Sequence, residues 1–188
     1  MSCSLILIRH AATQVDLTTP AHTWPLSDKG QQSCYDLAER LRPRHPSRII
    51  TSTETKARQT GYIIATVLQL PLESWPGLHE HARNNVTGLD QKTFVTQVAR
   101  LLTQPETHVF GLETGAQARQ RFTQAIHSIR QQYPDDTLAI VTHGTVLTLF
   151  IAAHNPIEPV SWWQNLRLPD FFCLTEPAFL LINHGDMA

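Results

Sequence analysis

The sequence lacks the features that accompany membrane-spanning or secreted proteins. Its 188 residues include three cysteines, at positions 3, 34 and 173, and none belongs to a C-x-x-C pair. This odd, widely spaced set predicts reduced thiols in a cytoplasmic protein. The apolar run Leu5–Ile8 is too short for a signal peptide. No run approaches the roughly 20 apolar residues of a membrane span, so we expect a soluble protein with no membrane partner.

An excess of charge of either sign is also missing. Lys and Arg total 15 and Asp and Glu total 16, so the net charge is −1 at pH 7 with neutral histidines. This balance gives no electrostatic sign of a nucleic-acid or membrane-surface partner. The sequence has no internal repeat or low-complexity segment, and no pattern in it sets an oligomeric state. A chain of 188 residues is most simply one domain, covering 1–188.

What the sequence does contain is an alternation of short apolar runs and amphipathic segments. The three clearest runs cover 4–8, 48–51 and 137–142. They are unbroken, as strands covered on both faces tend to be. A helical pattern follows each run, the first with Ser27 as N-cap, and two further helices are predicted at 91–102 and 115–131. We therefore expect an α/β three-layer sandwich, with a largely parallel central sheet and helices on both faces.

Weaker signals complete the sheet and mark an insertion. Residues 70–75 predict a fourth strand, and 170–176 with 178–184 predict an antiparallel hairpin at an edge. The pattern changes between 76 and 114, where one helix stands among loops. We expect this segment to be a small insertion over one end of the sheet.

Polar side chains follow each of the three strands at its carboxyl end. They are Arg9 and His10 after the first strand, Ser52, Lys56 and Arg58 after the second, and His143 with Gly144 after the third. The carboxyl ends of parallel strands meet at one crevice, where ligands of α/β sheets bind. Cationic side chains beside helix N-termini favour a phosphate group there. The sequence therefore predicts an anion site suited to phosphate.

Two histidines in a phosphate site permit a specific chemistry. A neutral imidazole can attack phosphorus and form a phosphohistidine, which divides one difficult displacement into two easier ones. Flanking cations stabilise the charge on the equatorial oxygens. An acid that protonates the departing alkoxide contributes a factor on the order of 10²–10⁴.

Four motifs carry a resemblance to a known family. They are LIRHAAT at 7–13, STETKARQT at 52–60, LHEH at 78–81 and VTHGTV at 141–146. In this order they resemble the histidine phosphatase superfamily, in its phosphoglycerate mutase-like branch. The resemblance extends from residue 5 to about 155. It implies an enzyme that uses no metal and no dissociable cofactor.

The resemblance also implies a role for each matching residue. His10 is the nucleophile that is transiently phosphorylated, Arg9 binds the phosphoryl oxygens, and His143 donates a hydrogen bond to them. Glu80 is the proton donor and then the base for the attacking water. Thr13 is expected to line the pocket as a further phosphate-binding residue, and Ser52 and the backbone after Gly144 are expected to line it as well.

The sequence departs from the family pattern at three positions. The usual glycine after the nucleophile is Ala11, the smallest available change. The usual asparagine six residues after the nucleophile is Asp16. Its carboxylate is expected near the phosphate in the pocket, with an outward orientation or a contact to the substrate as the alternatives. The second arginine of the family is replaced by Lys56, which supplies charge without a bidentate fork. We expect Lys56 to be the phosphate ligand and Arg58 to lie at the rim or surface.

Several residues also have simpler explanations. His79 and His81 could ligate zinc, but a third ligand at suitable spacing is missing. The pair Trp162-Trp163 is expected to pack in the core or at an edge, with a role in a substrate groove as the alternative. Glu113 is expected to cap the following helix or lie in its first turn.

The leading hypothesis is a metal-independent phosphatase that acts on a small phosphorylated substrate through phosphohistidine. A phosphomutase of the same fold is the nearest alternative. A weakly catalytic module that binds phosphate or phosphoproteins is a second, although binding alone needs neither a nucleophile nor an acid. Dephosphorylation of phosphohistidine proteins is a third.

Overall fold

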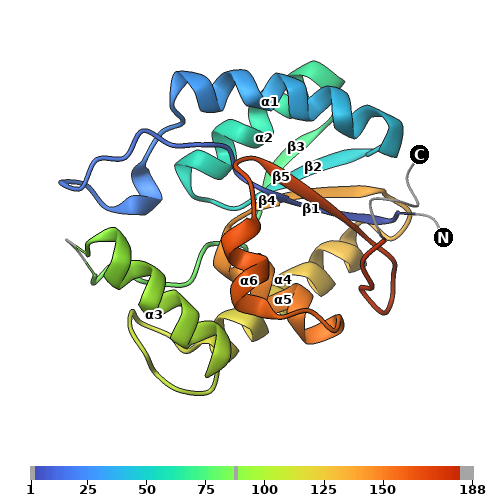
Figure 1. The fold of residues 1–188 in the computed structure, drawn as a ribbon. Helices are drawn as coiled ribbons and strands as arrows, with labels where there is room; N and C mark the ends of the chain where they lie inside the picture. Colours follow the sequence, from blue (N-terminus) through green and yellow to red (C-terminus); the bar gives the residue numbers. More distant parts are fainter. Residues whose placement is uncertain (1–2, 87–88, 183–188) are drawn as a thin grey trace.

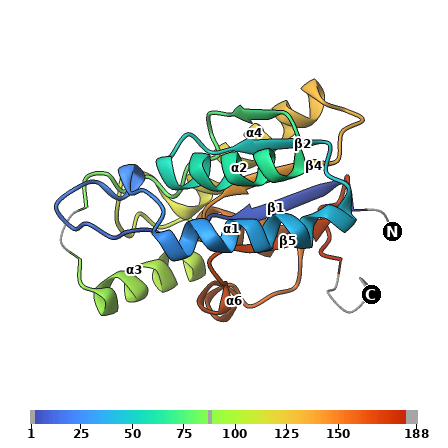
Figure 2. The same ribbon diagram turned by 90° about the horizontal axis from the view of Figure 1, so that it is seen from above.

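The computed structural model describes residues 3–86 and 89–182 and shows a five-stranded mixed sheet (Figures 1 and 2). The strand order is β3-β2-β4-β1-β5. The strands are β1 (Leu5–Arg9), β2 (Arg48–Thr51), β3 (Leu72–Ser74), β4 (Leu138–Thr142) and β5 (Asp170–Leu174). Four strands run parallel, and β5 pairs antiparallel with β1 at one edge. The predicted parallel strands are confirmed, including the weak one within 70–75.

The alternation of side chains along β1 divides the core into two layers. Leu5 and Leu7 pack with residues of the helices on one face, and Ile6 and Ile8 pack with those on the other. All four are fully buried. A strand covered in this way has no solvent-exposed face, which explains its unbroken apolar sequence.

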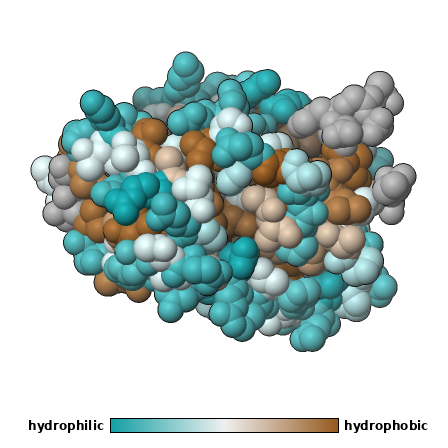
Figure 3. All heavy atoms as spheres, turned by 60° about the horizontal axis from the view of Figure 1, so that its bottom comes forward, coloured by the Kyte–Doolittle hydropathy of each residue, from teal (hydrophilic) through white to brown (hydrophobic). Residues whose placement is uncertain are grey.

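Helices cover both faces, so the predicted three-layer sandwich is confirmed. Helices α1 (Asp28–Leu41) and α2 (Thr55–Leu68) lie on one face, drawn above the sheet in Figure 1. The opposite face carries α4 (Gly115–Gln132), α5 (Gly144–His154) and α6 (Pro159–Asn165). Among the residues that the structure describes, no helix is long and apolar enough to cross a bilayer. On the side turned forward in Figure 3, apolar and polar residues are interspersed.

The helix starts follow local capping chemistry. Ser27 accepts a hydrogen bond from the Gly30 N–H at 3.1 Å and caps α1 as predicted. The expected capping role of Glu113 is wrong, because Thr114 forms a capping box with Gln117 at the start of α4. The short helix α6 was not predicted; the Glu158 side chain caps it.

The C-terminal hairpin is only half confirmed. Residues 170–174 form β5, but the second predicted strand makes a single isolated bridge, between Leu174 and Leu181. Phe179 has a φ of 54°, in the left-handed region, and this turns the chain out of the extended conformation. Asn183 and His184, the end of that predicted strand, lie outside the described residues.

The segment 76–114 contains one helix, α3 (Gln91–Thr103), as the sequence predicts. Its residues Val98, Leu101 and Leu102 pack with Leu149 of α5 in a separate apolar cluster. Trp163 joins this cluster, whereas Trp162 packs 5.0 Å from Phe172, between ring centroids. Both tryptophans therefore pack between elements, as expected. The description of 76–114 as an insertion stays a prediction.

The three cysteines Cys3, Cys34 and Cys173 are free thiols.

Candidate active site

His10 follows directly on β1, beside the end of β4. Its backbone N–H donates to the Thr142 carbonyl at 3.0 Å and so extends the ladder between the two strands. Its Nδ1 lies 2.8 Å from the Ala11 carbonyl oxygen. Because a carbonyl only accepts, this bond places the ring proton on Nδ1 and leaves a lone pair on Nε2. Burial, with the charge of nearby His143 and Lys56, holds the pKa of His10 well below its ordinary value.

Arg9 precedes His10, is held by the residue that follows α6 and lies against the start of α5. Its NH1 donates to the Leu166 carbonyl at 2.7 Å. Its Nε is buried and has no hydrogen-bond partner within 3–86 and 89–182. A Cβ atom at Gly144 would lie 3.1 Å from that Nε. Glycine at 144 therefore lets the guanidinium lie against the helix start, with a donor left for a ligand.

His143 links the ends of β4 and β2. Its Nε2 lies 2.8 Å from the Ser52 hydroxyl, and its ring centroid is 5.2 Å from that of His10. The side chain is fully buried, and burial lowers the pKa of His143 to about 4, although the Glu54 carboxylate opposes the shift. Its Nδ1 has no partner in the described part of the chain, so this nitrogen is left for a ligand.

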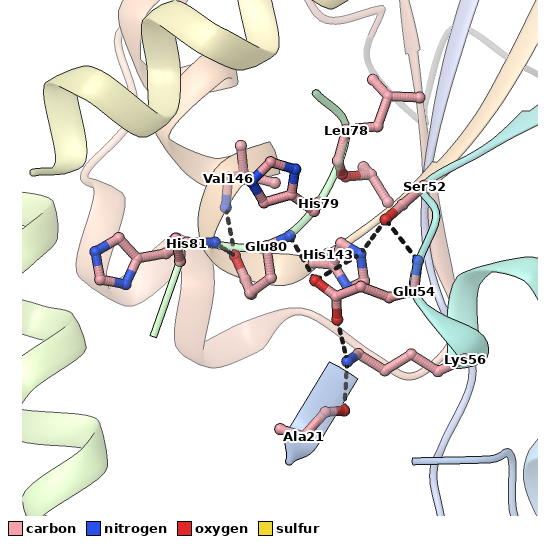
Figure 4. Close-up of polar contacts among 12 residues, drawn as sticks. Ala21, Ser52, Glu54, Lys56, Leu78, His79, Glu80, His81, His143 and Val146 are labelled. Carbon is pink, nitrogen blue, oxygen red and sulfur yellow. Dashed lines mark hydrogen bonds and ion pairs between the residues drawn. The ribbon is translucent and has the colours of Figure 1, made fainter. Parts of the chain in front are cut away.

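Glu80 lies at the N-terminus of α5, with both carboxylate oxygens bound by backbone N–H groups (Figure 4). Oε1 accepts from His81 at 2.8 Å and from Val146 at 3.1 Å, and Oε2 accepts from Thr145 at 3.1 Å. Burial alone would raise the pKa of Glu80. The Arg83 and His143 charges and these donors instead hold the pKa well below its usual range. Glu80 is therefore ionised in the ligand-free protein.

Glu54 is the main site residue that the sequence analysis missed. Its Oε1 accepts the Glu80 N–H at 2.9 Å and lies 3.6 Å from His143 Nε2. Its other oxygen forms an ion pair with Lys56, as Figure 4 shows. Burial would raise the pKa of Glu54, but the charges of His143 and Lys56 outweigh it and lower the value to about 2. The available signal was an acid two residues before the expected cationic ligand.

Lys56 therefore lies in the site but with its charge already paired. Besides contacting Glu54, its Nζ donates to the Ala21 carbonyl at 2.8 Å. Its charge still acts on both histidines, lowering the pKa of His10 and of His143. The expected role of Lys56 as a phosphate ligand stays a prediction.

Two other candidate pocket residues, Arg58 and Asp16, are exposed and have their contacts outside this cluster. Arg58 is exposed and lines a groove with Tyr35 and Tyr62, between α1 and α2. Asp16 is exposed, and its carboxylate accepts from the backbone and hydroxyl of Thr18 in its own loop. Its expected position near the phosphate stays a prediction, since the hydrogen bonds of its carboxylate are made within that loop.

The contacts that the structure shows for Thr13 and Ala11 are with neighbouring backbone and core residues. Thr13 forms an isolated bridge with Leu26, and Ala11 is fully buried with its N–H bonded to the Thr60 hydroxyl at 3.1 Å. The Ala11 Cβ is thus accommodated where the family pattern has glycine.

The loop that carries Glu80 is held by Arg121 of α4, a second residue that the sequence analysis missed. Arg121 NH1 donates to the carbonyls of Gly77 at 2.7 Å and His79 at 2.9 Å. Its NH2 donates to the Glu80 carbonyl and to the Glu113 carboxylate. These bonds tie the loop that carries Glu80 to helix α4. No local sequence pattern predicts them, because the bonded residues are far apart in the sequence.

The two histidines that flank Glu80, His79 and His81, do not face each other as ligands of one metal ion would. His81 is buried, and its Nε2 bonds to the Glu113 carbonyl at 2.8 Å. Figure 4 shows its ring directed away from His79. No three His, Cys, Asp or Glu side chains gather as metal ligands within the described ranges.

The cluster as a whole combines a neutral imidazole, two polar atoms without partners and a helix N-terminus. His10 Nε2 carries a free lone pair, and Arg9 Nε and His143 Nδ1 lack hydrogen-bond partners in the described residues. Backbone N–H groups at the start of α5 surround the Glu80 carboxylate. Such an arrangement suits transfer of a phosphoryl group.

Comparisons with known proteins identify the family of the chain. Residues 5–176 match the histidine phosphatase superfamily (branch 1). A search of curated proteins gave no match.

Solved structures share the fold. YhfR of Bacillus stearothermophilus is 23% identical with a TM-score of 0.74, covering 98% of this chain and 97% of that one. The α-ribazole phosphatase of Shigella flexneri is 20% identical with a TM-score of 0.71, covering 95% and 94%. A phosphoserine phosphatase mutant of Entamoeba histolytica in complex with phosphoserine is 18% identical with a TM-score of 0.71, covering 95% and 94%. The match over 5–176, together with this fold, places the chain in the histidine phosphatase superfamily.

Proposed function

We propose that the protein is a phosphatase that hydrolyses a small phosphomonoester through a phosphohistidine at His10. The observation that carries the proposal is the bond from His10 Nδ1 to the Ala11 carbonyl, which leaves Nε2 unprotonated. The low pKa of His10 keeps the ring neutral at pH 7. Family membership and the phosphatases among the structural neighbours support the same reaction class.

In the first half-reaction, Nε2 of His10 attacks phosphorus. The N–P bond forms, the P–O ester bond breaks, and the departing alkoxide takes a proton from Glu80. Arg9 Nε and His143 Nδ1 bind the phosphoryl oxygens and stabilise the transition state. Glu80 must therefore gain a proton when substrate binds. The negative charge of the phosphoryl group favours this, because a nearby like charge raises a carboxyl pKa.

In the second half-reaction, ionised Glu80 takes a proton from water, and the water oxygen attacks phosphorus. The O–P bond forms and the N–P bond breaks, which releases inorganic phosphate and restores His10. A phosphomutase would return the phosphoryl group to the bound product instead. Measured release of inorganic phosphate distinguishes the two reactions.

The nucleophile is tested by trapping. Rapid quenching with radioactive substrate is expected to label the wild type with phosphate that is labile in acid and stable in base. H10A is expected to lose both the label and the turnover of 4-nitrophenyl phosphate. The matched control is H108A, because His108 is exposed. Undiminished phosphate release by H10A would falsify the proposal.

The acid is tested by the dependence of the rate on the leaving group. E80Q keeps the shape of the side chain but cannot deliver the proton. We expect kcat to fall by about 10²–10⁴ for an alkyl phosphate. The loss should be much smaller for 4-nitrophenyl phosphate, whose leaving group needs little protonation. An equal loss for both substrates would assign Glu80 to capping α5 rather than to proton transfer.

A further inference from the structure

Arg83 lies on the leaving-group side of the site, three residues after Glu80. Its NH2 is 3.9 Å from Glu80 Oε2, and its guanidinium carbon is 4.9 Å from the centroid of the Phe94 ring on α3. Its side chain is 21% exposed. Arg83 thus bridges the acid and the helix of segment 76–114.

The guanidinium of Arg83 has hydrogen-bonding capacity that the protein does not use. Its NH1 is buried and lacks a partner in the described part of the chain. The 3.9 Å separation from Glu80 is an ion pair but is too long for a hydrogen bond. Arginine carries five donors in a planar fork that matches carboxylate and phosphate groups. Leaving such donors buried without acceptors costs free energy unless a ligand satisfies them.

Arg9 and Arg83 resemble each other in this respect and differ from Arg121. Each of the first two has a buried nitrogen without a partner among the described residues. Arg121 instead donates hydrogen bonds to three carbonyls and to the Glu113 carboxylate. Arg9 adjoins the nucleophile, whereas Arg83 adjoins the acid. The site therefore offers separate guanidinium groups to the two ends of a substrate.

We propose that Arg83 binds a second anionic group of the substrate, carried by its alcohol portion close to the ester oxygen. The inference rests on the proposed function, in which Glu80 protonates that oxygen. A general acid works within about 2.6–3.2 Å of its target. A carboxylate or phosphate on a neighbouring carbon then falls within reach of the Arg83 fork.

Binding of this second anion also affects Glu80. The Arg83 charge is one of the causes that keep the pKa of Glu80 low. When a substrate anion shares the guanidinium, its own negative charge offsets that of Arg83 and the pKa of Glu80 rises. The protonated acid that the first half-reaction needs is then favoured by the substrates that Arg83 selects.

The test compares substrates that differ by one anionic group. O-phosphoserine and O-phosphoethanolamine form the carboxylate pair, and the bisphosphate and the monophosphate of ethane-1,2-diol form the phosphate pair, in which the second phosphate is on the neighbouring carbon. For wild-type protein, kcat/KM is expected to favour the doubly anionic member of at least one pair by about 10–100-fold, as a charge-assisted hydrogen bond would give. The pair that shows the preference identifies the anion.

The variants are R83Q and R83K, with R100Q as the matched control because Arg100 is exposed on α3. R83Q is expected to lower kcat/KM for the preferred substrate by about 10–100-fold and for its partner by less than about threefold. R83K is expected to recover part of the preference, and R100Q to keep all of it. Equal losses on both members of a pair would overturn the inference, since Arg83 would then act only through Glu80.

A binding measurement separates this inference from the proposed function. Calorimetry with H10A is expected to show tighter binding of the preferred member of the pair, and the double variant H10A/R83Q to show none of that preference. A preference that survives in the double variant overturns the role of Arg83. If wild-type protein turns over phosphoethanolamine by a route that needs His10 but shows no preference in either pair, the inference fails and the proposed function stands. If turnover does not need His10, the proposed function fails. The calorimetric comparison of H10A with H10A/R83Q then decides whether Arg83 binds the second anion.

Discussion

The two sides of the candidate site are built in different ways. Arg9, His10 and His143 stand at the ends of neighbouring strands, where the pairing of Arg9 with Thr142 sets their relative positions. Glu80 stands on a loop outside the sheet, where side-chain hydrogen bonds from distant residues, chiefly Arg121 and Glu54, hold the backbone beside the acid. We call these the strand-end side and the loop side.

The difference shows where precision in a site comes from. A strand end is fixed by the backbone ladder and by apolar residues that the whole sheet buries, so no single side chain decides its position. The loop side depends on a few charged groups at long sequence separation. Each of these groups is half-buried or more, so its loss leaves polar partners unsatisfied. The loop side is therefore the one that single substitutions should displace.

The largest effect is expected from R121A. It removes the donors to the carbonyls of Gly77, His79 and Glu80 and leaves Glu113 without its cation. We expect kcat for an alkyl phosphate to fall about 100-fold, because a displacement of about 1 Å costs that much. The free energy of unfolding should fall by about 2–4 kcal/mol. Kinetics and urea unfolding measure the two effects.

The control for R121A is R119A on the same helix. Arg119 is 37% exposed and lies 3.9 Å from Glu106, which is itself exposed. Its removal should change stability by less than about 1 kcal/mol and leave kcat as it was. If R121A lost stability but kept kcat, the loop side would be positioned by other contacts.

The pH dependence of stability tests the strand-end side. His143 has a native pKa of about 4, while the unfolded chain binds a proton near 6.5. The unfolded state therefore binds more protons throughout that window, so stability falls as the pH decreases from 6.5 toward 4. We expect His143 to account for a loss of about 2 kcal/mol between pH 7 and pH 5. Urea unfolding at both values measures it.

The comparison protein for this slope is H143Q. It should lose the part of the pH dependence that comes from His143, while His10 still contributes in the same direction. Carboxylates such as Glu54, with a pKa of about 2, lose their stabilising effect only below pH 4.5 and leave the upper window unaffected. Identical slopes for wild type and variant would show that His143 is not held neutral by the fold.

E54Q tests how the two sides are joined. Glutamine keeps an oxygen for the Glu80 N–H but removes the charge that pairs with Lys56. Lys56 then acts unopposed, so inorganic phosphate should inhibit about 3–10-fold more strongly. Inhibition constants measure this. Adding K56Q to E54Q should cancel the increase in inhibition by phosphate. Weaker inhibition in E54Q alone would show that Lys56 is not a phosphate ligand.

The contrast between the two sides also separates what sequence could and could not predict. The strands and the residues that follow them are local patterns, so the positions of Arg9, His10 and His143 were predictable. The bonds of Glu54 and Arg121 to the Glu80 loop were not, because the residues that they join lie 26 and more than 40 positions apart in the sequence. Glu80 came from the resemblance, but its ionised state depends on the helix N-terminus that surrounds it.

The failed predictions have equally physical causes. Capping of α4 passed from Glu113 to Thr114, one residue later, because a hydroxyl can form the reciprocal capping box with Gln117. The second strand of the hairpin failed where Phe179 adopts a positive φ, which no apolar pattern reports. Both errors concern one residue's local conformation rather than the order of the elements.

The smallest effect is expected from A11G, which restores the family's glycine next to the nucleophile. Ala11 is fully buried with Leu26 and Cys34, and its N–H is held by Thr60. Glycine removes a buried methyl group and adds freedom to the unfolded chain, so stability should fall by about 1–2 kcal/mol. Because the ladder already fixes the neighbouring His10, kcat should stay within about twofold. A tenfold change in kcat would mean that the strand-end side, too, depends on single side chains, and the distinction between the two sides would fail.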